Sequence, residues 1–189
     1  MILSPLEEAQ RLADILKIAE LADGVCAKHG TRDPFEIASE EGVRVCRYDL
    51  GTLAGMYVVI ESTPFIAISE ALESREAYTV CAHELGHHLL HFSLAKTSAL
   101  ADSSLFSGGG RLENEANIFA CQLLVSDGEF CEAMDGKREL FAVASELSIP
   151  AELAALKCDI LREKGYKINS VDFSADFMKN LIKNPLTEF

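Results

Sequence analysis

The segment HELGHHLLH, residues 83–91, contains four of the five histidines in the chain. His83 and His87 are four residues apart, which on an α-helix separates them by about 40° around the axis and about 6 Å along it. Both imidazoles can therefore reach one metal ion. With Glu84 the segment reads H-E-x-x-H, in which two histidines bind zinc and the glutamate accepts a proton from metal-bound water. The pattern requires a helix here and predicts a zinc hydrolase.

A catalytic zinc needs a third protein ligand and an open position for water. His91 lies about 12 Å beyond His83 along the helix axis, too far to share one tetrahedral ion with it. The predicted helix ENEANIFACQLL, residues 113–124, offers two carboxylates instead. Glu113 shares its face with small and apolar residues, namely Ala116, Ala120, Leu123 and Leu124. Glu115 lies about 160° away, so Glu113 is predicted to bind the metal, and Glu115 to face water and tolerate replacement by alanine.

Further residues near the motif are candidates for supporting roles. Asn117 follows Glu113 by one turn on the same face, so its amide is placed to orient His83 or His87. Gly86, like the alanines beside Glu113, is small where the two helices are expected to approach closely. Acyl hydrolysis also needs a donor to stabilise the oxyanion. Four residues remain open for that role: Tyr57, Tyr78, His88 and His91.

Capping signals and hydrophobic periodicity divide the rest of the chain into elements. Ser4 and Pro5 predict the start of a first helix, and Asp33 with Pro34 predicts a second that stops at Gly42. Strands are predicted at 43–48, 55–60 and 64–69, the metal helix at 74–92, a Ser/Ala/Gly-rich loop at 93–110, and helices at 111–125, 138–147 and 150–164. About 25 residues of weakly amphipathic tail follow.

This order of elements predicts an α+β protein with a zincin-like core. The core would hold a small β-sheet, the H-E-x-x-H metal helix, a second ligand helix and a C-terminal helical pair. An edge of the sheet would bind an extended peptide across the zinc. We expect residues 1–128 to form the zincin-like metallopeptidase domain, and residues 129–189 to form a helical appendage packed on the same domain.

Composition and charge limit the cellular location and the classes of binding partner that we expect. The 189 residues are 49% hydrophobic, enough for a sizeable core. The N-terminus has no basic leader before an apolar stretch, and no apolar run reaches about 18 residues, which predicts a cytoplasmic protein with no membrane partner. Six scattered cysteines predict reduced, mostly buried thiols. A net charge of -13 repels phosphate backbones, so no nucleic-acid partner is expected.

The motifs resemble the ImmA/IrrE family of metallopeptidases. HELGHHLLH followed by ENEANIFACQLL, with DPFEIASEEGVRV and GTLAGMYVVI upstream, matches that family from roughly residue 30 to 125. The resemblance implies that His83, His87 and Glu113 bind zinc and that Glu84 is the catalytic base. It also implies a protein substrate, namely a helix-turn-helix repressor of a mobile element or stress regulon. Ser126 stands where family members often have proline, so the local turn is expected to differ.

Two other classes of function are alternatives. The chain could be a regulatory component, such as a toxin-antitoxin type module, that uses the zinc fold to bind a protein without hydrolysis; the intact Glu84 argues against this. It could instead be a DNA-binding regulator through residues 138–164, which read as helix, Ser-Ile-Pro turn and helix. Between Lys137 and Lys167, six Lys or Arg stand against five Asp or Glu, which is not the basic surface that DNA binding needs.

Overall fold

The computed structural model describes residues 5–96, 100–102, 110–135 and 139–168. Ser4, the predicted cap of the first helix, lies outside these residues, as do parts of the predicted loop 93–110 and the tail from residue 169 onward. Among the described residues no helix is long and apolar enough to cross a bilayer.

The strands form one sheet, and three of them are the predicted ones. β1 (Arg44–Tyr48) pairs in parallel with β3 (Thr63–Ser69), which pairs antiparallel with β2 (Gly55–Ile60). Outside β2 lies β4 (Leu100–Asp102), in the order β1-β3-β2-β4 over the described residues. β4 falls within the segment predicted as a loop. β4 forms because the free edge of β2 supplies its backbone hydrogen-bonding partners. These partners are distant in the sequence, so the three residues of β4 alone do not predict a strand.

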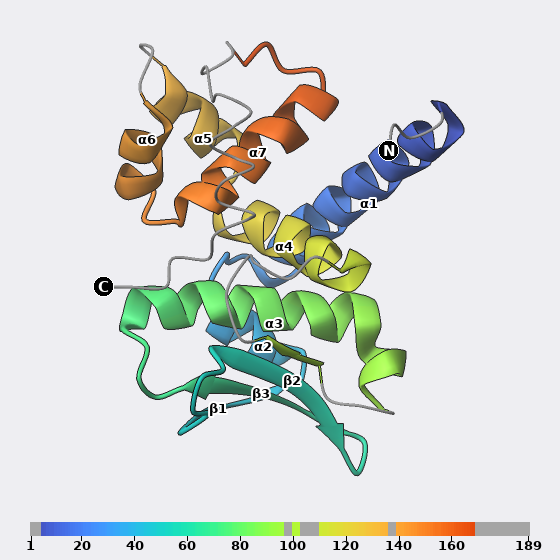
Figure 1. Ribbon diagram of the computed structural model, residues 1–189, viewed down its shortest axis with the longest axis vertical. Coiled ribbons are helices and arrows are strands. Elements are labelled where there is room, and N and C mark those ends of the chain that lie inside the picture. The colour runs from blue at the N-terminus through green and yellow to red at the C-terminus, as the bar shows by residue number, and fades with distance from the viewer. Residues whose placement is uncertain (1–4, 97–99, 103–109, 136–138, 169–189) are drawn as a thin grey trace.

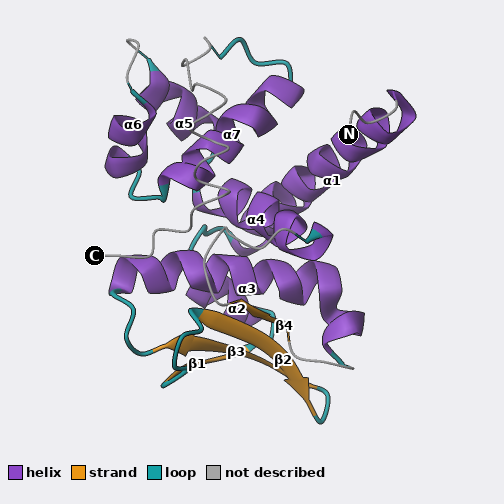
Figure 2. Ribbon diagram, in the orientation of Figure 1, coloured by secondary structure: helices purple, strands orange, loops and turns teal. Residues whose placement is uncertain are grey.

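The helices build layers on one face of this sheet, as Figures 1 and 2 show. They are α1 (Pro5–His29), α2 (Pro34–Glu40), α3 (Ser74–Ala95), α4 (Arg111–Leu124), α5 (Asp127–Met134), α6 (Leu140–Glu146) and α7 (Ala151–Glu163). α3 crosses the sheet, α4 packs on the side of α3 that is turned away from the sheet, and α5–α7 lie beyond α4. The predicted α+β fold class is confirmed.

Capping residues explain where the short helices begin. The side chain of Asp33 accepts hydrogen bonds from the backbone N–H groups of Phe35 and Glu36, so α2 starts as predicted. α5 was not predicted. Ser126 caps it by accepting from Glu129 N, while the Glu129 carboxylate accepts from Ser126 N in return. The serine at the usual proline position therefore begins a new helix.

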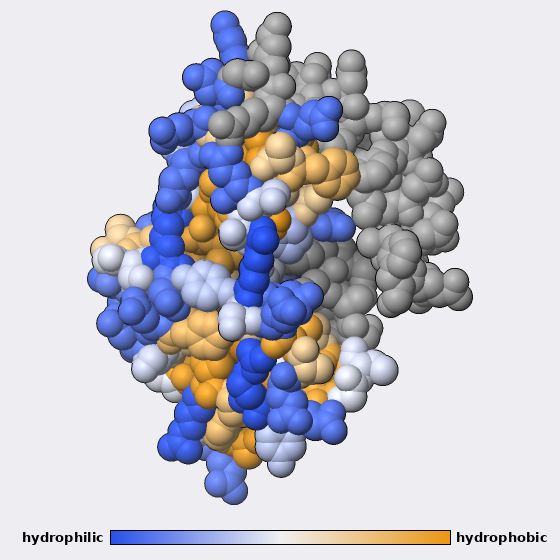
Figure 3. Space-filling view, turned by 90° about the vertical axis from the view of Figure 1, so that its left-hand side faces the viewer, coloured by the Kyte–Doolittle hydropathy of each residue, from blue (hydrophilic) through white to orange (hydrophobic). Residues whose placement is uncertain are grey.

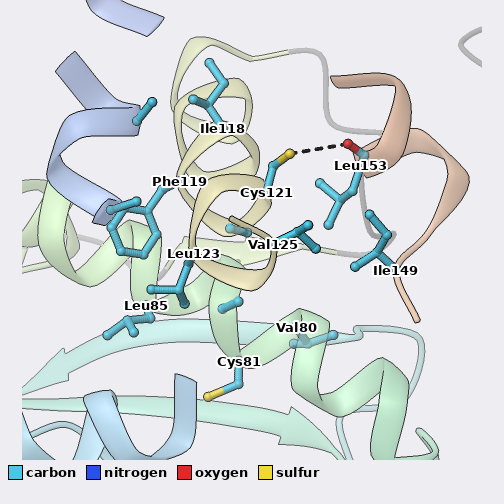
Figure 4. Close-up of a cluster of buried hydrophobic side chains, with 14 of the residues drawn as sticks. Val80, Cys81, Leu85, Ile118, Phe119, Cys121, Leu123, Val125, Ile149 and Leu153 are labelled. Atoms are coloured by element: carbon cyan, nitrogen blue, oxygen red, sulfur yellow. Dashed lines mark hydrogen bonds between the residues drawn. The ribbon is translucent and has the colours of Figure 1, made fainter. Parts of the chain in front are cut away.

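The core runs from the sheet, α1 and α2 through α3 and α4 to the C-terminal helices, and Figure 4 shows its part around α3, α4 and α7. Phe119 and Leu123 of α4 are fully buried, and the thiol of Cys121 donates to the backbone carbonyl of Leu153 at 3.3 Å. All six cysteines are free, and the four buried ones are Cys26, Cys81, Cys121 and Cys158, as the composition predicted. A Cβ on Gly86 would lie 3.1 Å from Ala116 Cα. This confirms the close approach of α3 and α4.

Polar contacts also attach the C-terminal helices to the rest of the molecule. Lys157 of α7 is fully buried, and its Nζ donates to Gln122 Oε1 at 2.6 Å, Val125 O at 2.7 Å and Asp127 Oδ1 at 2.8 Å. At the start of α3, Arg75 donates to Ser148 O at 2.9 Å. Figure 3 looks onto the side of the molecule where α3 begins, and hydrophobic patches alternate there with hydrophilic side chains.

Candidate metal centre

The packing of α3 on α4 brings three predicted ligand residues together. One ring nitrogen of His83, one of His87 and one carboxylate oxygen of Glu113 lie within 4.8 Å of one another. The Nε2 atoms of the two histidines are 3.2 Å apart, and the Glu113 oxygens lie 3.2 Å and 3.4 Å from them. Both imidazoles are buried, whereas the Glu113 side chain is 23% exposed. Of the three ligand side chains, Glu113 is therefore the one that solvent reaches.

The chemistry of this cluster suits a cation. Oε2 of Glu113 is buried and lies 3.2 Å from His83 Nε2, yet within the described part of the chain no donor has hydrogen-bond geometry to it. That geometry is expected where nitrogen and oxygen lone pairs converge on a shared centre. Burial lowers the pKa of His87, which favours its neutral form. A neutral imidazole and an ionised carboxylate are the forms that bind metals.

Asn117 contacts His83, as its place one turn after Glu113 suggested. Its Oδ1 lies 2.8 Å from Nδ1 of His83, and both side chains are buried. The amide oxygen only accepts, so the imidazole carries its proton on Nδ1. The lone pair of Nε2 is then directed at the cluster.

Glu115 does not face water, contrary to the prediction from the helical wheel. Its side chain is only 18% exposed, and its Oε2 lies 2.9 Å from Nε2 of His91. His91 is itself buried, and its Nδ1 lies 2.9 Å from Nδ1 of His87. The wheel fails here because His91, at the bend in α3, reaches the side of α4 that carries Glu115.

Glu84 is buried where α3 passes beneath the first residue of β2. A Cβ on Gly55 would lie 2.6 Å from Glu84 Oε1 and 2.4 Å from Val80 Cγ1. Only glycine allows the strand to approach the carboxylate so closely. Gly55 also pairs with Asp102 of β4, so β4 occupies the sheet edge beside Glu84.

The other candidates for an oxyanion donor have contacts of their own. The hydroxyl of Tyr57 lies 2.8 Å from Nδ1 of His88, and burial raises the pKa of this tyrosine to about 12. Tyr78 packs on Phe35 of α2, with ring centroids 6.1 Å apart. Tyr57 and His88 are therefore paired with each other, whereas Tyr78 belongs to the contact between α3 and α2.

Comparison with known proteins places this chain in a family. The sequence profile of the IrrE N-terminal-like domain, a peptidase family, matches residues 38–159. The chain belongs to the ImmA/IrrE family of metallopeptidases. It is 30% identical to Metallopeptidase ImmA of Bacillus subtilis strain 168 over an alignment of 119 residues. This alignment covers 62% of this chain and 68% of that protein. It is also 35% identical over 131 residues to uncharacterized immunity region protein 2 of Bacillus phage phi105, covering 69% and 82%.

Membership in the ImmA/IrrE family confirms the resemblance read from the motifs. It identifies the chain as a member of a peptidase family, and the cluster of His83, His87 and Glu113 supports a metal cofactor. Two histidines on a helix beside a small sheet, with a carboxylate on the next helix, are what a zincin-like core predicts. The match from residue 38 to 159 runs on through α5, α6 and most of α7. The division of the chain at residue 128 stays a prediction.

Proposed function

We propose that this chain is a zinc-dependent endopeptidase in which His83, His87 and Glu113 bind one Zn²⁺ and Glu84 is the catalytic base. The observation that carries the proposal is the convergence of the three ligand groups at 3.2–3.4 Å, with the Glu113 side chain partly exposed. Two histidines, one carboxylate and an open position are the ligand set of catalytic zinc in metallopeptidases.

The residues divide the chemistry between them. Bound zinc polarises the peptide carbonyl and lowers the pKa of water. Glu84, held beneath Gly55, accepts the proton of the attacking water and delivers it to the leaving amine. Asn117 keeps the proton of His83 on Nδ1 and thereby keeps Nε2 available.

The substrate we propose is a protein, specifically a helix-turn-helix repressor of a mobile element or stress regulon. Support comes from the family and from the relative in phage phi105, whose printed name places that relative in an immunity region. An extended segment of the substrate would reach Glu84 along the sheet edge that β4 now forms.

The charges of the C-terminal helices do not favour DNA binding. Among the described residues 139–168, three basic side chains are already paired with aspartates: Lys157 and Lys164 with Asp127, and Arg162 with Asp159. Paired cations contribute little to a phosphate-binding surface. We therefore propose no nucleic-acid partner.

Glu84→Gln tests the proposed chemistry, because the amide keeps the shape of the side chain but removes the proton acceptor. Zinc-loaded wild-type and variant protein are incubated with a cell lysate, and newly formed protein N-termini are labelled and sequenced. We expect new N-termini with the wild type, a loss of about 100-fold or more in the variant, and equal zinc content in both. Equal cleavage by both proteins would refute the role of Glu84, and binding of a lysate protein without cleavage by the wild type would favour the non-hydrolytic regulator.

A further inference from the structure

Two residues beyond the proposed ligands form a connected chain with His87. His87 Nδ1 lies 2.9 Å from His91 Nδ1, and His91 Nε2 lies 2.9 Å from Glu115 Oε2. We propose that His91 and Glu115 are positioning residues, which hold the proton of His87 on Nδ1 and so direct its Nε2 to the metal. This inference rests on the zinc site proposed above.

The positions of the protons follow from the acceptor at the end of this chain. A carboxylate only accepts hydrogen bonds, so the 2.9 Å contact with Glu115 requires a proton on His91 Nε2. When that is the one proton on His91, its Nδ1 has a lone pair, and the 2.9 Å contact requires that His87 Nδ1 donate. His87 is thereby left with its lone pair on Nε2, the atom that lies 3.4 Å from Glu113 and 3.2 Å from His83 Nε2.

Burial makes this arrangement specific. His87 and His91 are 1% and 4% exposed, so water does not compete effectively for their ring nitrogens. Glu115 is held in turn by Arg111, whose Nη1 donates to Oε1 at 3.1 Å from a side chain that is 80% exposed. The chain therefore runs from the solvent-facing Arg111 inward to His87.

The backbone of α3 departs from helical geometry at His91, the residue whose side chain links α3 to Glu115 of α4. His91 has φ -124° and ψ 17°, whereas the flanking residues continue as helix to Ala95. Its ring uses both nitrogens, one toward His87 on its own helix and one toward Glu115 on α4.

The two proposed histidine ligands thus have different supports. Asn117 supplies a neutral acceptor behind His83, whereas Glu115 supplies an anionic acceptor behind His87 through His91. An anionic acceptor makes the attached imidazole a stronger base and a stronger metal ligand. The two glutamates near the start of α4 therefore have different tasks, with Glu113 in the cluster and Glu115 behind it.

The test is a competitive Zn²⁺ titration of the full chain with substitutions at both positions. We expect His91→Ala and Glu115→Ala each to raise the zinc Kd by about 10- to 100-fold, because the proton of His87 loses its acceptor. Glu115→Gln should lose less, since the amide oxygen still accepts from His91. Glu132→Ala on α5 removes the same charge from an exposed position and should bind zinc as the wild type does.

A spectroscopic measurement separates positioning from a general loss of structure. In ¹⁵N-labelled zinc-free protein, the ring nitrogen shifts of His87 should show the proton on Nδ1 in the wild type and a mixture of both tautomers in His91→Ala. Should the alanine variants fail to fold, the wild-type spectrum and Glu115→Gln decide the matter. A wild-type His87 protonated on Nε2, or unchanged zinc affinity in folded His91→Ala and Glu115→Ala, would overturn the proposal.

Failure of the zinc site itself gives a different result. If the wild type binds no zinc, or if His83→Ala binds it as tightly as the wild type, the proposed function fails. If the wild type binds zinc tightly, His83→Ala does not, and the His91 and Glu115 variants match the wild type, only the positioning role fails.

Discussion

At the scale of single residues, Gly55 leaves the space in which the carboxylate of Glu84, the proposed base, lies. Any side chain there would overlap Glu84 and Val80, so Gly55→Ala must displace the carboxylate or the strand. We expect a loss of cleavage of at least about tenfold with a much smaller change in zinc affinity, since a displacement near 1 Å at a reacting group is costly. Rates and zinc titrations on one preparation check this.

A matched control for Gly55→Ala lies in α1. Gly24 is inside a regular helix, and no atom of the residues that the structure describes lies within 4 Å of a Cβ built on it. Gly24→Ala should leave cleavage unchanged and stabilise the protein by about 0.5–1 kcal/mol, because alanine favours helix. Equal loss of cleavage in both variants would show that Gly55 is not special.

At the scale of elements, the spacing of α3 and α4 determines the metal cluster. His83 and His87 lie on one helix and Glu113 on the other, and Gly86 touches Ala116 between them. Gly86→Ala should force the helices apart by a few tenths of an ångström and cost about 1–3 kcal/mol of stability. Thermal unfolding should also show a smaller stabilisation by added zinc than in the wild type; an unchanged zinc effect would contradict this account.

The junction of α1 and α2 is expected to depend on pH. His29 contacts Glu40 and Glu41 through its two ring nitrogens, and these hydrogen bonds raise the pKa of His29. Protonated His29 therefore stabilises the fold below the ordinary histidine pKa of about 6.5, and this contribution is lost as pH rises through the higher folded pKa. Urea unfolding between pH 6 and 9 should show this loss in the wild type but not in His29→Gln. Parallel curves for the two proteins would contradict the role of His29.

Local patterns in the sequence predict most elements, because helix-capping residues and the spacing of hydrophobic residues determine structure over a few neighbouring positions. The three strands and α2–α4 lie within a few residues of their predicted bounds. β4 was missed because its partners are in β2, and α5 because the capping box at Ser126 and Glu129 was not recognised. The geometry of His83, His87 and Glu113 follows from helix periodicity, but the contact between His91 and Glu115 depends on the bend in α3 and on the packing of α4.

At the scale of the whole molecule, buried Lys157 ties α7 to α4 and α5. Its three hydrogen bonds leave no donor unpaired, and with Lys164 and Gln122 it overcomes the effect of burial and lowers the pKa of Asp127 to about 2. Lys157→Ala should destabilise the fold by about 2–4 kcal/mol, because Gln122 Oε1 and Val125 O lose their buried donor while Asp127 keeps Lys164. Urea unfolding measures the change, and a loss under about 1 kcal/mol would contradict this structural role.

The central claim is that one zinc ion is bound by His83, His87 and Glu113. Anomalous diffraction from crystals of the zinc-loaded protein, recorded on both sides of the zinc absorption edge, tests it most directly. The account predicts a single peak between α3 and α4, about 2.0–2.1 Å from Nε2 of both histidines and about 2.0–2.2 Å from a Glu113 oxygen. A peak bound by Glu115 in place of Glu113, or a peak away from the two histidines, would contradict it.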